Sequence, residues 1–126
     1  MSDPMTFDDL SELYRNEMNS SVLSSVREDL YPAMATLCIR LEKVCNQFAA
    51  DPDSIEWEVA EQRKKSAKRL SNEIIRIRTT KVCNMAFLEG IGQKVLEKPL
   101  VDEEEEYYLW IKRLTRDQMN MWRRAI

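Results

Sequence analysis

Histidine is absent from the 126 residues of this chain. Its absence removes the commonest general base, the usual nitrogen ligand of zinc and the middle member of a Ser-His-Asp triad. A phosphate-binding loop is missing too, because "GIG" at residues 90–92 lacks the lysine and the serine or threonine that a P-loop needs. We therefore predict a protein that is not an enzyme, with no catalytic residues, no cofactor and no metal.

Glycine and proline are also scarce, at 2 and 4 residues. So few turn-forming residues favour long helices over many short strands. A chain of this length is one domain and can bury a real core. The composition predicts an all-α fold over residues 1–126, a bundle of about four main helices around one long central helix.

Long apolar runs and paired cysteines are missing as well. No apolar run approaches the roughly 18 residues of a membrane span, and the start "MSDPMTFDDL" is too acidic for a secretory signal. Cys38 and Cys45 lie two helical turns apart, about 10 Å and too far for a disulfide, and Cys83 has no CxxC partner. We expect free thiols, no membrane contact and a cytoplasmic location.

The first two helices have recognisable beginnings. Thr6 can cap the first helix, with Asp9 as its capping-box partner three residues later. The second helix should begin near Asp29, because Pro32 is tolerated only in the first turn. Its apolar residues recur at three- and four-residue steps, which is the pattern of a buried face.

The third helix is expected to run unbroken over residues 54–89. Asp53 is the predicted N-cap, Glu56 its capping-box partner and Gly90 the C-cap. At 1.5 Å per residue this helix is about 50 Å long. Because that exceeds one compact bundle of this size, one end should project or be covered by another chain.

Residues 90–101 form an internal linker before the last helix, which should begin near Asp102. The acidic run at 103–106 suits the positive end of the helix dipole, and we expect these carboxylates to be solvated. The predicted seam by which this helix contacts the bundle consists of Tyr107, Ile111, Leu114, Met121 and Ala125.

One stretch of the third helix is basic. Its cations cover a broad arc, as on a solvated helix, and the net charge of -3 and the lack of interleaved aromatics predict weak or no direct DNA binding. Two alternatives stay open: a small nucleic-acid-binding regulator using residues 63–81, and an all-helical enzyme that holds an anionic substrate. The residues that would contact nucleic acid are Arg63, Lys64, Lys65, Lys68 and Arg69.

Three further cations, Arg76, Arg78 and Lys81, fall in the apolar half of the same helix. A charge there must pair or reach water along the helix surface. We interpret the three as fixed ion pairs within the chain or with another subunit. The candidate acidic partners are Glu28, Asp29, Glu42 and the run at 103–106.

More apolar surface is present than one small bundle needs to hide. The stripes of the last three helices and two tryptophans of the fourth helix therefore predict association with another chain. The subunit-interface candidates are Leu30, Tyr31, Ile74, Ile77, Met85, Tyr107, Trp110 and Trp122.

Four segments, taken in order, resemble a known family. They are "FDDLSELYRNEMNSS", "LSSVREDLYPAMATLCIRLEKV", "SNEIIRIRTTKVCNMAF" and "VDEEEEYYLWIKRL". Their order and spacing are similar to the helical A-domain of GINS subunits of the archaeal type. Departures are Leu30-Tyr31 in place of Phe-Tyr and the less basic Thr79-Thr80. The chain stops at "RRAI", so the resemblance implies an A-domain without the usual small β-rich B-domain.

The resemblance implies a non-enzymatic scaffold of DNA replication. GINS subunits form a tetramer, of one or of two kinds of chain, that links and activates the MCM helicase with a RecJ-like partner. DNA polymerase or primase are further candidate partners. An archaeal member would act in the cytoplasm at the nucleoid.

Overall fold

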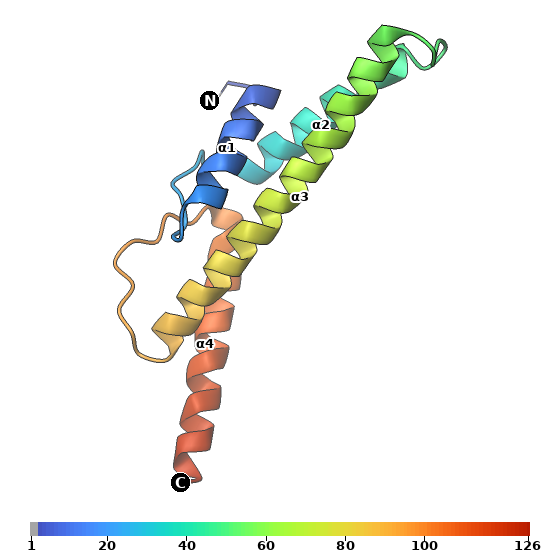
Figure 1. Cartoon of the computed structure of the whole chain (residues 1–126). Helices are drawn as coiled ribbons and strands as arrows, with labels where there is room; N and C mark the ends of the chain where they lie inside the picture. The colour runs from blue at the N-terminus through green and yellow to red at the C-terminus, as the bar shows by residue number, and fades with distance from the viewer. Residues whose placement is uncertain (1–2) are drawn as a thin grey trace.

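The computed structural model describes residues 3–126, and within them it contains four helices and no strand. The helices are α1 (Phe7–Asn19), α2 (Leu30–Gln47), α3 (Ile55–Gly90) and α4 (Asp102–Arg124). Figure 1 shows α3 as the long axis, with α1 and α2 beside its N-terminal half and α4 beside its C-terminal half. The predicted all-α fold of about four helices with one long central helix is confirmed.

The predicted beginnings of α1 and α2 agree with the structure. The Thr6 hydroxyl accepts the Asp9 N–H at 3.0 Å, and the Asp9 carboxylate accepts the Thr6 N–H at 2.9 Å, which completes a capping box. Asp29 is the N-cap residue of α2, although its side chain makes no capping hydrogen bond. Pro32 falls in the first turn, where a missing N–H costs nothing.

The predicted cap of α3 was wrong by one residue. Ser54 is the N-cap, and its hydroxyl oxygen accepts the Trp57 N–H at 3.1 Å. The Ser54 N–H donates to the Asp51 carbonyl at 3.1 Å, so a turn holds residues 51–54 and delays the helix. Asp53 is exposed ahead of the cap, and Glu56 is not its capping-box partner.

Gly90 is the last residue of α3 rather than its C-cap, which is Ile91. A Cβ added at Gly90 would lie 2.8 Å from the Thr115 Cβ and 2.9 Å from the Lys112 carbonyl oxygen of α4. Gly92 instead has the positive φ, at +98°. Gly90, the glycine predicted to end α3, is therefore a position where α3 and α4 approach too closely for a side chain, whereas Gly92 has open space around it.

Two apolar clusters lie along α3, and Arg78 is between them in sequence. The first cluster joins α1, α2 and the N-terminal half of α3. The second joins the C-terminal half of α3 to α4. The buried residues of the first cluster are Met5, Leu10, Leu30, Ala33, Met34, Leu37, Ala67, Leu70 and Ile74. Those of the second are Leu23, Val82, Ala86 and Tyr108.

The predicted seam of α4 was correct for Tyr107 and Ile111, which pack against the second cluster, and wrong for Leu114, Met121 and Ala125. The buried face carries Glu104 and Tyr108, whereas Leu114 and Met121 are 54% and 60% exposed. Leu114 and Met121 therefore lie in an apolar stripe on the solvent-exposed side of α4. Past Thr115, beside the end of α3, α4 continues alone, so the projecting end predicted for α3 belongs to α4 (Figure 1).

Candidate interaction surface

A buried ion network lies where all four helices meet. The Arg78 side chain is fully buried, and its Nε and Nη2 donate to the two Glu104 oxygens at 2.7 Å each. Its Nη1 donates to Glu17 at 2.7 Å and to the Ser24 carbonyl at 2.9 Å, and Nη2 also donates to the Pro99 carbonyl at 3.3 Å. Every N–H of this guanidinium therefore has an acceptor.

The Glu17 and Glu104 carboxylates accept further hydrogen bonds besides those from Arg78. The Lys81 ammonium donates to Glu17 Oε2 at 2.6 Å. Glu104 Oε2 also accepts the Tyr31 hydroxyl at 2.6 Å, and Oε1 accepts the Val101 N–H at 3.1 Å. The two cations and two carboxylates cancel in charge. A neutral, fully hydrogen-bonded cluster offsets much of the cost of taking these ions out of water.

Burial and hydrogen bonding compete for the protonation states of the network. Burial disfavours the charged forms of Glu104 and Arg78, but the bonds between them prevail. The pKa of Glu104 is lowered and the pKa of Arg78 is raised. Burial, followed by the bond to Glu104, raises the pKa of Tyr31, so its hydroxyl stays protonated and remains a donor. All the charges of this pair are kept at neutral pH.

The sequence located one partner of Arg78 and missed the other. Glu104 belongs to the acidic run proposed as a partner, yet it is 5% exposed and not solvated as expected. Glu17 of α1 was not among the candidate acidic partners that the sequence suggested. Arg76 is not in the core; its side chain is 64% exposed and pairs at 2.7 Å with Glu73 on its own helix.

Two of the interface candidates are in the chain's own core. Leu30 and Ile74 are almost fully buried in the first cluster, so they are not available to another subunit in this fold. Tyr31 is half-buried and belongs to the ion network. The other half-buried candidates are Ile77, Met85 and Tyr107, and the exposed ones are Trp110 and Trp122.

The basic stretch of α3 is partly neutralised. Lys64 and Lys65 lie 3.2 and 3.5 Å from the two Glu61 oxygens. The Arg63 guanidinium lies 5.6 Å from the centre of the Phe7 ring, within cation–π range. The Lys64 side chain is only 21% exposed, so its placement on the solvated face was wrong. The exposed members of this stretch are Arg63, Lys65, Lys68 and Arg69.

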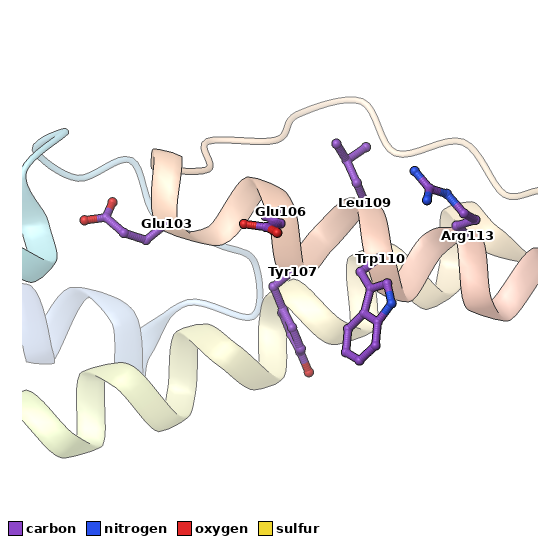
Figure 2. A pocket seen from close by; sticks show the side chains of 6 residues that line it. All are labelled: Glu103, Glu106, Tyr107, Leu109, Trp110 and Arg113. Atoms are coloured by element: carbon purple, nitrogen blue, oxygen red, sulfur yellow. The ribbon is translucent and has the colours of Figure 1, made fainter.

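The largest aromatic residues on the surface are on α4. Trp110 is 61% exposed, and with Leu114 and Met121, four and eleven residues later, it forms one stripe along the helix. Figure 2 shows Tyr107 and Trp110 pointing to the same side of α4. A hollow of about 520 Å³ beside them is bounded by Glu103. We call the face formed by Tyr107, Trp110, Leu114 and Met121 the α4 stripe.

The chain exposes more surface than a compact monomer of its mass. Its accessible surface is 8784 Å² at 14.9 kDa. The scaling for monomeric proteins gives about 7,000 Å² for that mass, about 1,800 Å² less. An elongated shape with one unaccompanied helix end accounts for this excess (Figure 1).

The search for similar proteins returned none: no family model, curated protein or solved structure matches this chain. Across residues 3–126, no helix is both long and apolar enough to cross a membrane. The same part of the chain contains no group of three or more acidic or cysteine side chains placed to hold a metal ion.

Proposed function

We propose that this chain is a non-catalytic scaffold subunit that assembles with other helical subunits as GINS subunits do. The observation that carries the proposal is the α4 stripe, which exposes Trp110, Leu114 and Met121 on one helix face. Exposed apolar patches that contain aromatic residues are typical of protein interfaces. Tryptophan is also among the residues that contribute most to binding energy at such interfaces.

The identity of the assembly comes from the resemblance of four ordered segments to the GINS A-domain. In the proposal, the chain joins a tetramer that links and activates the MCM helicase with a RecJ-like protein during DNA replication. DNA polymerase or primase would be further partners. The buried network supports a scaffold role, because Arg78 and Lys81 are consumed by internal bonds and are not presented to a substrate.

The pairing of Lys64 and Lys65 with Glu61 supports a scaffold over a nucleic-acid-binding regulator. Phosphate contacts need free cations, and binding through them weakens steeply as salt rises. A duplex DNA titration at two salt concentrations would separate the two functions. We expect weak affinity for the isolated chain, whereas tight and strongly salt-dependent binding would favour the regulator.

The direct test mixes the chain with a second GINS-type subunit and with the MCM helicase of the same organism. Light scattering should show a stable complex, and the complex should increase the rate of ATP-dependent unwinding. Trp110→Glu should abolish the complex. Val59→Glu, at an apolar position of α3 that is 51% exposed, is the matched control and should keep it. A chain that stays monomeric and binds neither protein would contradict the proposal.

A further inference from the structure

Three apolar residues on the outer face of α4 are evenly spaced about Leu114. Tyr107 and Met121 each lie seven residues from Leu114, one before it and one after it. Seven residues are about two helical turns, so all three share the α4 stripe. The spacing of these three residues is therefore the same when α4 is read from either end, whereas the counterpart of Trp110 is the polar Gln118.

The charges beside the stripe are antisymmetric about nearly the same point. Glu106 lies nine residues before Thr115 and Arg124 nine after it; Arg113 lies two before it and Asp117 two after it. The spacings of seven, four and seven residues from 106 to 124 place all four charges on one flank of the stripe. All four are exposed. The closest cation to Asp117 is at 3.9 Å, a loose contact.

We propose that α4 binds the α4 of a second copy of this chain, antiparallel, around a two-fold axis near Leu114 and Thr115. This inference rests on the proposed scaffold function and names the first partner at the α4 stripe. A two-fold axis brings each residue before the axis opposite the one at equal distance after it. Tyr107 then faces the partner's Met121, and Leu114 faces the partner's Leu114.

The same symmetry pairs the flanking charges. Glu106 faces the partner's Arg124, and Arg113 faces the partner's Asp117, so each dimer gains four pairs of opposite charge. A parallel arrangement would instead place Glu106 beside the partner's Glu106 and Arg124 beside the partner's Arg124. Like charges opposite one another exclude wrong arrangements. The N-terminal end of each α4 also lies beside the C-terminal end of the partner helix. Two antiparallel helix dipoles attract each other, because the positive end of one lies beside the negative end of the other.

The geometry leaves room for the second copy. α3 lies against the face of α4 that carries Glu104 and Tyr108, and of the stripe only the half-buried Tyr107 also packs there. α3 has ended where α4 passes Thr115 (Figure 1). From residue 106 to residue 124 the contact would run about 27 Å along the helix.

The test is a charge exchange, followed by sedimentation over a concentration series. Glu106→Arg alone and Arg124→Glu alone should each raise the dimer dissociation constant about tenfold, because each turns two attractive pairs into repulsive ones. The double variant Glu106→Arg/Arg124→Glu should return the constant to within about threefold of the unaltered chain. Glu105→Arg, next to Glu106 in the sequence but on another face of α4, is the control and should leave the dissociation constant unchanged.

Leu114→Glu should abolish the dimer, because it places two carboxylates against each other at the axis. Circular dichroism checks that each variant stays folded. A chain that is monomeric at about 100 μM, or a double variant no better than the singles, would overturn the self-pairing. If the monomeric chain still binds a GINS-type subunit through Trp110, the proposed function stands and only the self-pairing fails. If the chain forms the dimer but binds neither such a subunit nor the helicase, the self-pairing stands and the proposed function fails.

Discussion

Arg78 of α3 and Glu104 of α4 form a two-point ion pair inside the molecule, with both N–O distances at 2.7 Å. The planar guanidinium fits the two carboxylate oxygens in a way that a lysine cannot. Glu17 of α1 and Tyr31 of α2 complete the contact. One buried arginine therefore connects all four helices at the boundary between the two apolar clusters.

Replacing Arg78 should be the most damaging single change in this network. Arg78→Met leaves the buried Glu104 carboxylate without a cation and Glu17 with Lys81 alone, and should cost about 3–5 kcal/mol of unfolding free energy. Arg78→Lys should lower the unfolding free energy by a smaller amount, because the ammonium keeps the charge but loses the two-point contact of the guanidinium with Glu104. Urea unfolding measures both, with exposed Arg69→Met as a control that should stay within about 0.5 kcal/mol. Equal losses at positions 78 and 69 would contradict the buried network.

The Tyr31 hydroxyl should contribute measurably to the junction of α2 and α4. Tyr31→Phe removes a hydrogen bond to a charged acceptor at 2.6 Å and should cost about 1.5–3 kcal/mol. A thermal melt of Tyr31→Phe, Glu104→Gln and the double variant should show losses that do not add, because the two side chains share one bond. Tyr14→Phe, on α1 outside the network, serves as the control. Strict additivity would show that the bond is not made.

Gly90 should resist even a small side chain. Helix propensity alone would make Gly90→Ala stabilising by about 1 kcal/mol. The contacts of 2.8 and 2.9 Å with α4 predict instead a net loss of about 1–3 kcal/mol. Adding Thr115→Ser removes the methyl group at 3.0 Å and should recover part of that loss. The same addition should not help Gly92→Ala, whose cost comes from its positive φ. A stabilised Gly90→Ala variant would refute the close approach.

The N-cap of α3 offers a direct comparison of two adjacent residues. Ser54→Ala removes the acceptor of the Trp57 N–H and should destabilise the chain by about 1 kcal/mol. Asp53→Ala should change stability by less than about 0.5 kcal/mol, because its side chain caps nothing. Chemical denaturation of the two variants side by side decides between them. A larger loss at Asp53 would restore the original prediction.

Stability toward acid should depend on Glu89. Ion pairs with Lys112, at 2.8 Å, and Lys98, at 2.7 Å, lower the pKa of Glu89 from 4.5 to about 2. Because the folded pKa is the lower one, this stabilisation is complete above about pH 4.5 and is lost as pH falls to about 2. Glu89→Gln should flatten the fall in unfolding free energy over that window, and Lys112→Met should do so in part. An unchanged acid limb would rule out the ion pairs.

Local features were predictable because they depend on near neighbours. Thr6 and Asp9 are three residues apart, so their capping box could be derived from the sequence. The cap of α3 was missed by one residue, because the turn at 51–54 competes with the helix for the same backbone groups. Glu17 could have been found: it lies seven residues after Leu10 on the buried face of α1, where an acid needs a cation.

The sequence by itself determined that the chain is helical, that α3 is long and that Arg78 needs a partner. Scarce turn residues, apolar periodicity and the cost of an unpaired buried charge are properties of the residues themselves. Only the tertiary structure decided which acidic residues form ion pairs with Arg78 and which face of α4 is buried. Those outcomes depend on contacts 61 and 26 residues apart, to Glu17 and Glu104, and no local preference encodes them. Because burying Glu104 against Arg78 orients α4, its apolar stripe is left facing outward.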